Sequence, residues 1–509
     1  MTVLPSFAGS AGVSVRQAEV RALRVAQEAA AHVPAYARFL RLAGYDPARL
    51  RGFADFCQLP ILDKASYLTR YPLDQRCRRG ELPRAHIVTL SSGSSGQPVL
   101  WPRFPEQDAL LEASFAAMFQ EHFRIQERWT LLVVTLAMGS WVAGTLVAEM
   151  GQRIFARPGV RGTVVTPGLN QDEALRFIEQ LGPHYDQTII IGYPAPLASL
   201  LEAGEQHGIA WPALNVQLVT GGEYVSEGQR ERALERIGKD PERLEGFVVL
   251  FASSEVAGAL GYETPLCLLV RRLCARSPAL TEALFGSRVI PSLVQYDPQN
   301  YFLQIEQGEI LLTTRGAVPL VRYNTHDRGG LLSAAELLAR CQAHGYDLLA
   351  ELRRRGLGPE AYRPLPLVYV FGRSDAATVH GANVYVEQVR AVLEQPGLPA
   401  FTSGRFRLGA STDPDGRATL RVEVELRPGV EASPDLSASY QQAVAQGLQQ
   451  VNSEFRSAYE AARGRLEVQV VLLPFGAFDQ TRGKHQYLAR NHRADLTASE
   501  ATNGGRGAI

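Results

Sequence analysis

The stretch NVQLVTGGEYVSEGQRERALERIG, residues 215–238, decides the fold class of this chain. Its first residues form a short, nearly continuous apolar run, which is typical of a strand buried on both faces of a sheet. After two glycines, Ser226 and Gln229 have the spacing of a capping box, which predicts that a helix begins there. A buried strand followed by a helix is the repeating unit of a parallel α/β sheet.

The same unit recurs along the chain from about residue 130. Short apolar runs such as QTIIIGYP and FVVLFASSE alternate with helical stretches such as NQDEALRFIEQLG, which predicts a mostly parallel sheet with helices on both faces. Ligands of such sheets bind beyond the C-terminal ends of the strands. The residues expected at those ends are Tyr193, Thr220–Glu223 and Ser253–Glu255.

The segments before and after these strands in the sequence have other patterns. Residues 15–45 carry apolar residues at helical spacing, and we expect a helical N-terminal unit over about 15–85. The segment YFLQIEQGEILLTT predicts a hairpin with its turn at Gln307–Gly308. The helical, partly polar segment 331–360 is interpreted as an insertion.

Residues 375–509 are expected to form a separate small domain. Within it, RFRLGASTDPDGRATLRVEVEL predicts two strands around an Asp-Pro-Asp-Gly turn, SASYQQAVAQGLQQVNSEFRSAYEAA predicts one long helix, and LEVQVVLLP predicts a further strand. The predicted fold class is therefore α/β. A large N-terminal domain of mixed sheets and flanking helices spans residues 1–374, and a small, mobile α+β domain spans 375–509.

Composition and charge restrict the classes of protein to which this chain could belong. The chain has 509 residues and a formal net charge of zero, so no overall field draws it to nucleic acid or to a membrane. It has no apolar run long enough to span a bilayer and no secretory signal pattern, and its five scattered cysteines suit a reducing cytoplasm. Cys267 and Cys274 are spaced too widely for the usual zinc pair, which favours buried thiols.

The loop TLSSGSSGQPVLWPR, residues 89–103, carries the strongest signal for a ligand. Small hydroxyl side chains, exposed backbone amides and glycines suit a loop wrapped around a phosphate. It lacks the Gly-Lys-Ser/Thr ending of a Walker A loop, and it lacks the glycine spacing of a dinucleotide fingerprint. Taken alone, it is also compatible with a plain surface turn, which is the less favoured reading.

Six segments in sequence order resemble the motifs of the adenylate-forming enzymes, the superfamily of acyl-coenzyme A synthetases, peptide-synthetase adenylation domains and luciferases. They are SSGSSGQP, TGGEYVSEGQRERALE, LFASSEVAG, PLVRYNTHDRG, FGRSDAATVHGANVYVEQVR and QTRGKHQYLAR. The helical segment that begins HVPAYARFLRLAGYDP is similar to the start of phenylacetate–coenzyme A ligases. The resemblance to this branch covers about residues 20–495.

The resemblance implies a role for each matching residue. Lys484 would reach both the carboxylate of the acid and the α-phosphate of ATP, and Glu255 would hold Mg²⁺. By residue type alone, Lys484 could be a solvated charge, and Glu255 could be a carboxylate at a helix N-terminus. Gly221–Glu223 would line the adenine, with Asp327 and Arg373 at the ribose. The implied ATP-binding set is Ser91, Ser92, Gly93, Ser94, Ser95, Gly96, Gly221, Gly222, Glu223, Ser254, Asp327 and Arg373.

The resemblance also implies an acid pocket, a hinge and a path for coenzyme A. Asp375 would be the hinge between the domains, and Gly381 would lie on the pantetheine path, where a side chain would obstruct it. Aromatic residues at the acid positions suit a flat aryl acid, although they could equally be plain core. The residues at the acid positions are Trp141, Tyr193, Phe251 and Ala257.

Three departures from the family pattern bear on function. Gln97 stands where the family has lysine, Phe251 replaces a tyrosine, and Ala252 replaces a glycine. An amide cannot neutralise a phosphate, so Gln97 weakens the expected hold on ATP or pyrophosphate. These changes leave acid activation expected, but they leave the identity of the acid and of the acceptor open.

The expected activity is ATP- and Mg²⁺-dependent conversion of an aryl or arylacetic acid to an acyl-adenylate, followed by thioester formation with coenzyme A. An alternative is adenylation with transfer to an amine, as in an amide synthetase, or to a carrier protein. A non-catalytic homologue is a third reading, which the presence of Lys484, Glu255 and Asp327 disfavours. We expect a cytoplasmic protein that binds small molecules, without nucleic acid or membrane partners, and a homodimer is compatible with this.

Overall fold

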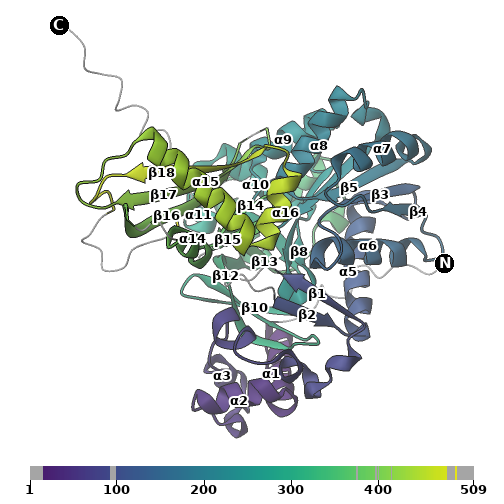
Figure 1. The fold of residues 1–509 in the computed structure, drawn as a ribbon. Coiled ribbons are helices and arrows are strands. Elements are labelled where there is room, and N and C mark those ends of the chain that lie inside the picture. Colours follow the sequence, from purple (N-terminus) through teal and green to yellow (C-terminus); the bar gives the residue numbers. More distant parts are fainter. Residues whose placement is uncertain are drawn as a thin grey trace. The chain divides into compact units, whose positions relative to one another are not determined.

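The computed structural model describes residues 15–91, 99–373, 376–395, 398, 400–413, 415–478 and 488–489. They form two compact units. The first contains the described residues up to Arg373 together with Asp415 and Gly416, and the second contains the described residues of 376–413 and 417–489. Figure 1 labels many of the elements of the two units, which are described separately below.

The first unit is built on an 11-stranded sheet with the strand order β10-β11-β12-β13-β9-β8-β7-β6-β5-β3-β4. Strands β4, β3, β5, β6 and β7 run parallel to one another, and from β7 to β10 each neighbouring pair is antiparallel. The predicted mixed α/β fold is therefore confirmed, and the parallel prediction holds for residues 130–253. The strands are β3 Thr130–Thr135, β4 Gly162–Val165, β5 Gln187–Gly192, β6 Val216–Gly221, β7 Phe247–Ser253, β8 Gly258–Tyr262, β9 Ser292–Tyr296, β10 Tyr301–Glu306, β11 Glu309–Thr314, β12 Leu320–Leu332 and β13 Leu367–Arg373.

The parallel strands are covered by helices on both faces, because their apolar residues alternate between the two sides. Ile189 and Ile191 of β5 pack in one core cluster with α5 and α6, whereas Ile190 packs in another with α7, α8 and α9. The helices are α5 Pro105–Phe123, α6 Val142–Phe155, α7 Gln171–Leu181, α8 Pro194–Gln206 and α9 Glu227–Arg236. The capping box predicted at Ser226 and Gln229 is present at the start of α9.

The antiparallel strands are also sandwiched. On one side lies the predicted helical N-terminal unit, in which Ala22, Ala26 and Ala29 of α1 belong to the same core as strands β10 to β13. On the other side pack α10 to α13, with Cys267 and Cys274 buried among them, so the buried-thiol interpretation is confirmed. The helices are α1 Val15–His32, α2 Pro34–Leu42, α3 Phe53–Cys57, α4 Leu73–Arg76, α10 Pro265–Arg276, α11 Pro278–Phe285, α12 Ala334–Ala343 and α13 Leu348–Arg354.

The structure confirms two predicted hairpins. Strands β10 and β11 pair antiparallel around Gln307 and Gly308, which both have positive φ, as a tight hairpin turn requires. In the second unit, β16 Thr402–Thr412 and β17 Ala418–Leu426 pair around the predicted Asp-Pro-Asp-Gly segment. No helix in the described part of the chain combines the length and apolarity needed to cross a bilayer.

The second unit has its own core, in which helices pack against a three-stranded sheet of order β16-β17-β18. Strand β18 runs parallel to β17, and a separate two-stranded hairpin is formed by β14 and β15. The elements are β14 Ala376–Val379, β15 Ala382–Tyr385, α14 Val386–Leu393, β16 Thr402–Thr412, β17 Ala418–Leu426, α15 Pro434–Val451, α16 Ser453–Ala461 and β18 Leu466–Leu473.

The single long helix predicted in this unit is wrong, because the chain forms α15 and α16 with a break at Asn452. Asn452 has extended backbone angles, and its side-chain oxygen accepts a hydrogen bond from the Phe455 amide at 2.9 Å, so it caps α16. Its side-chain nitrogen donates to Asn383 O at 2.9 Å and to Gln388 Oε1 at 3.0 Å. One local hydrogen bond and two to residues far away in the chain thus outweigh continuation of the helix.

We expect Asn452→Ala to lower the free energy of unfolding of the second unit by about 2 kcal/mol. The substitution removes a helix cap and leaves buried polar partners unsatisfied, since Asn452 is only 3% exposed. Ser433→Ala is the matched control, because Ser433 caps α15 at an exposed position with one hydrogen bond. Denaturant unfolding followed by circular dichroism compares the two. An equal, small loss in both variants would show that the buried contacts of Asn452 contribute nothing.

Candidate active site

The C-terminal ends of the parallel strands bring predicted site residues to one edge of the first unit. Tyr193 follows β5, Gly221–Glu223 end and follow β6, and Ser254 and Glu255 follow β7. These three strands are adjacent in the sheet, with Gly192 opposite Thr220. Ligands of α/β sheets bind at this edge.

The two glycines of the segment predicted to line the adenine are required by close approach of their neighbours. Gly222 has φ of +82°, and a Cβ there would lie 3.3 Å from Cε1 of Tyr193. A Cβ on Gly221 would lie 3.1 Å from the carbonyl oxygen of Leu250. Any side chain at 222 would therefore be strained by its backbone and crowded by an aromatic ring. The structure brings Tyr193, predicted for the acid pocket, against the segment predicted for adenine.

Glu255 is half-buried and is oriented by two hydroxyl groups. The Tyr323 hydroxyl donates to its Oε1 at 3.2 Å, and the Ser253 hydroxyl donates to its Oε2. The backbone amide of Glu255 in turn donates to Ser253 Oγ at 3.2 Å. A carboxylate accepts at about four lone-pair positions. With one donor on each oxygen, Glu255 retains acceptor capacity for a hard cation such as Mg²⁺.

Asp327 and Arg373, both predicted at the ribose, lie opposite each other on neighbouring strands. They are paired residues in the antiparallel ladder of β12 and β13. The Asp327 amide donates to Thr325 Oγ1 at 3.3 Å. Strand β12 also carries Tyr323, whose hydroxyl contacts Glu255. The same strand therefore provides both the contact to Glu255 and one member of the Asp327–Arg373 pair.

The base of the predicted phosphate loop is anchored at the same edge. Strands β1 Ile87–Ser91 and β2 Val99–Arg103 form an antiparallel hairpin, and the Trp101 indole donates to Ser91 Oγ at 2.9 Å. Ser91 can therefore still donate its own proton to a ligand. Leu90 donates to Ser140 O at 2.7 Å and bridges to Trp141, which precedes α6. Of the loop itself, Ser92, Gly93, Ser94, Ser95, Gly96 and Gln97 lie outside the described residues.

The other residues of the predicted acid pocket share a core. Ala257 is buried with φ of +52°, and Phe251 packs against the same cluster, to which Val142 also belongs. Val142 follows Trp141 directly, so that residue lies at the border of this core. Phe251 and Ala257 thus contact plain core residues, as the alternative reading allowed, while the pocket itself stays a prediction.

The residues assigned to the second unit are only partly described. Gly381 lies with His380 in the tight turn between β14 and β15, and both have positive φ. Burial lowers the pKa of His380 to about 4, so its imidazole is neutral at pH 7. Lys484 and Asp375 lie outside the described residues.

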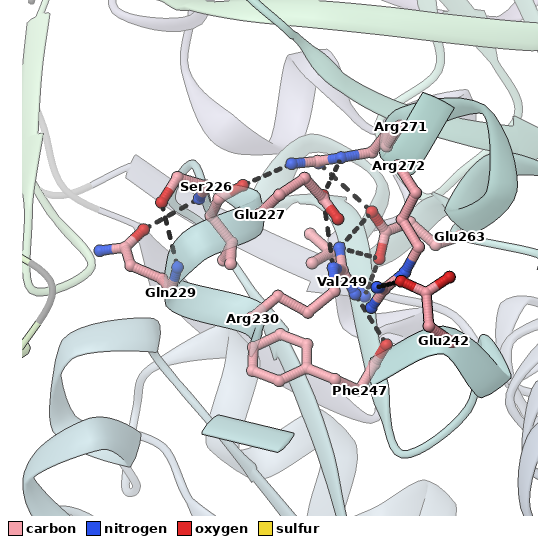
Figure 2. A network of polar contacts seen from close by, with 11 residues as sticks. Ser226, Glu227, Gln229, Arg230, Glu242, Phe247, Val249, Glu263, Arg271 and Arg272 are labelled. Carbon is pink, nitrogen blue, oxygen red and sulfur yellow. Dashed lines mark hydrogen bonds and ion pairs between the residues drawn. The ribbon is translucent and has the colours of Figure 1, made fainter. Parts of the chain in front are cut away.

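Sequence reasoning missed a set of buried charged residues around the start of α9 and strand β7 (Figure 2). They are Glu227, Arg230, Glu263 and Arg271, all at most 7% exposed. Burial opposes ionisation of Glu227, but the charges of Arg230 and Arg271 lower its pKa. The sequence did contain a sign of buried charge, because Arg271 and its neighbour Arg272 interrupt the mostly apolar helix PLCLLVRRLCAR.

Comparison with known proteins identifies structural relatives. No protein-family model matches the sequence, and no curated protein sequence matches it. The solved structure of 2-hydroxyisobutyryl-CoA ligase in complex with 2-HIB-AMP and CoA, in the thioesterification state, aligns over 99% of this chain and 97% of the ligase, with a TM-score of 0.65 and 14% sequence identity. The same ligase in the postadenylation state with R3-HIB-AMP aligns over 96% and 91%, with a TM-score of 0.52 and 15% identity. The chain therefore shares the fold of an acid–CoA ligase over nearly its whole length.

Proposed function

We propose that this protein is an adenylate-forming acid–thiol ligase of the phenylacetate–coenzyme A ligase-like family. It would join a carboxylic acid, in our expectation an aryl or arylacetic acid, to the α-phosphate of ATP, with release of pyrophosphate. Coenzyme A would then accept the acyl group as a thioester and release AMP. The observation that carries the proposal is the strand edge of the first unit, where Gly222 and Glu255 lie at adjacent strand ends and Tyr323 joins Glu255 to the strand of Asp327.

Each half of the reaction has candidate residues in this proposal. Glu255 would hold Mg²⁺, which offsets the negative charge of the phosphates when bound. Gly221–Glu223 and the Asp327–Arg373 pair would position the adenosine, so that the α-phosphate faces the acid. Lys484 would stabilise the negative charge that builds up as the carboxylate oxygen attacks phosphorus. Gly381 would leave room for pantetheine, and Asp375 would act as the hinge of the second unit.

Pyrophosphate release tests this proposal. Purified protein is incubated with ATP, Mg²⁺ and a panel of carboxylic acids, with and without coenzyme A. The proposal expects release that depends on the acid, turns over repeatedly with coenzyme A and stops after about one equivalent without it. Repeated turnover only with an added amine or carrier protein would favour the alternative acceptors. No acid-dependent release across aryl, arylacetic and short aliphatic acids would contradict the proposal.

Gln97→Lys should tighten the binding of ATP and of pyrophosphate. A charge-assisted contact to phosphate is worth about 1–2 kcal/mol more than a neutral one, which corresponds to roughly 5- to 30-fold in affinity. Isothermal titration with each ligand measures the change, and Gln97→Met is the control that removes the amide without adding charge. Unchanged or weaker binding in the lysine variant would show that residue 97 does not contact the terminal phosphates.

A further inference from the structure

Glu263 is the centre of the buried charge cluster shown in Figure 2. Its carboxylate accepts two hydrogen bonds from Arg230, at 2.7 and 2.8 Å, and one from Arg271 at 3.3 Å. Arg271 also donates to Glu227 Oε1 at 2.8 Å. Arg230 and Arg271 thus pair with two carboxylates away from water, and the nearby charge of the buried Arg272 also favours the ionised form of Glu227. Displacing any member would leave a charge unpaired in a low-dielectric interior, so the cluster holds a fixed geometry.

Arg271 extends from this cluster to the segment that follows β6. Its Nη2 donates to the carbonyl oxygen of Val225 at 2.5 Å, and its guanidinium carbon lies 5.7 Å from the ring centroid of Tyr224. Residues 222–226 belong to neither a helix nor a strand. Their positions therefore depend on side chains that hold them, namely Arg271 in the middle and the Ser226 capping box at the end.

The same cluster also fixes the neighbouring strand. Glu263 Oε2 accepts a hydrogen bond from the Val249 amide of β7 at 2.9 Å, and Arg230 donates to Phe247 O at 2.8 Å. Strand β7 ends at Ser253, two residues before Glu255. One network thus holds both the segment next to Gly222 and the strand that leads to Glu255.

We infer that Arg271 is a positioning residue for the adenosine end of ATP, an inference that rests on the proposed function. Arg271 is fully buried and acts through Val225 and Tyr224 rather than by contact with the nucleotide. It sets the position of Gly221–Glu223 relative to Glu255, which would bind the opposite, phosphate end of ATP. Loss of Arg271 weakens recognition of adenosine and leaves recognition of the phosphates and the metal intact.

The test compares a ligand that contains adenosine with one that lacks it. In Arg271→Met, the dissociation constant for Mg²⁺–ATP should rise roughly tenfold, whereas that for Mg²⁺–pyrophosphate should stay within about twofold. In steady-state assays, KM for ATP should rise while kcat is retained at saturating ATP. Arg276→Ala is the matched control, since Arg276 lies on the same helix in an exposed ion pair with Glu242.

A second variant distinguishes a specific loss of ATP affinity from a loss of folding. The double substitution Glu227→Gln with Arg271→Met leaves the net charge of the cluster unchanged and keeps the Arg230–Glu263 pair in place. It should fold and show the same selective loss of ATP affinity. Unchanged ATP binding, or equal weakening of ATP and pyrophosphate in the folded double variant, would overturn the inference. Wild-type protein that binds neither ligand would instead refute the proposed function on which the inference rests.

Discussion

Lys484→Ala should reduce the rate of acyl-adenylate formation by about 10²- to 10³-fold while leaving the thermal unfolding temperature unchanged. Loss of one charge directed at the transition state costs about 3–4 kcal/mol of activation free energy. The residue type supports this role, because Lys64, Lys239 and Lys484 are the lysines in a chain that carries 52 lysines and arginines together. A plain surface cation in this sequence would be an arginine in most cases.

Single-turnover assays of adenylate formation measure the effect, with Arg482→Ala as the control for loss of a neighbouring positive charge. The control should retain wild-type activity. Lys484→Arg should remain impaired, because a planar guanidinium does not reproduce a compact ammonium group. If Lys484→Ala forms adenylate at the wild-type rate, the residue has no part in the first half-reaction.

Glu263→Gln should lower the free energy of unfolding of the first unit by about 3–5 kcal/mol. The substitution keeps the shape of the side chain but leaves Arg230 and Arg271 to share the single charge of Glu227 in the interior. Wild-type Glu263 has no measurable exposure, so water cannot offset the lost charge.

Chemical denaturation of the purified variant checks this value. Glu282→Ala is the control, because the side chain of Glu282 is 58% exposed and its ion pair with Arg288 lies at the surface. Exposed pairs contribute about 0–1 kcal/mol, so the control should lose little stability. Similar losses in both variants would show that the buried cluster contributes no more than a surface ion pair.

The parts of the fold that follow local rules could be predicted from the sequence. The continuous apolar run of β5 and the capping box at Ser226 report directly on backbone and burial, and both predictions hold. The break between α15 and α16 could not be predicted. The backbone conformation of Asn452 depends on hydrogen bonds to partners such as Asn383, which is about 70 residues away in the chain. A polar residue within a helical pattern gives no sign of whether a distant partner exists.

The candidate site likewise contains some residues that could be predicted from the sequence and others that could not. Glu255 and Asp327 were predicted from motifs, but the Tyr323 hydroxyl that orients Glu255 comes from a strand 68 residues further along the chain. Arg271 and Glu263 were not predicted, because charged residues are mostly exposed and only the fold reveals that these are buried and paired. Residues that act through contacts across the fold are therefore the ones that sequence patterns omit.

Detection of the acyl-adenylate by mass spectrometry tests the central claim most directly. Protein is mixed with Mg²⁺–ATP and an acid that supports pyrophosphate release, quenched before and after addition of coenzyme A, and the small molecules are analysed. The account predicts a species with the mass of the acid joined to AMP, which disappears on addition of coenzyme A as the acyl-CoA and AMP form. Formation of ADP and an acyl phosphate, or consumption of ATP with no species that joins the acid to AMP, would contradict it.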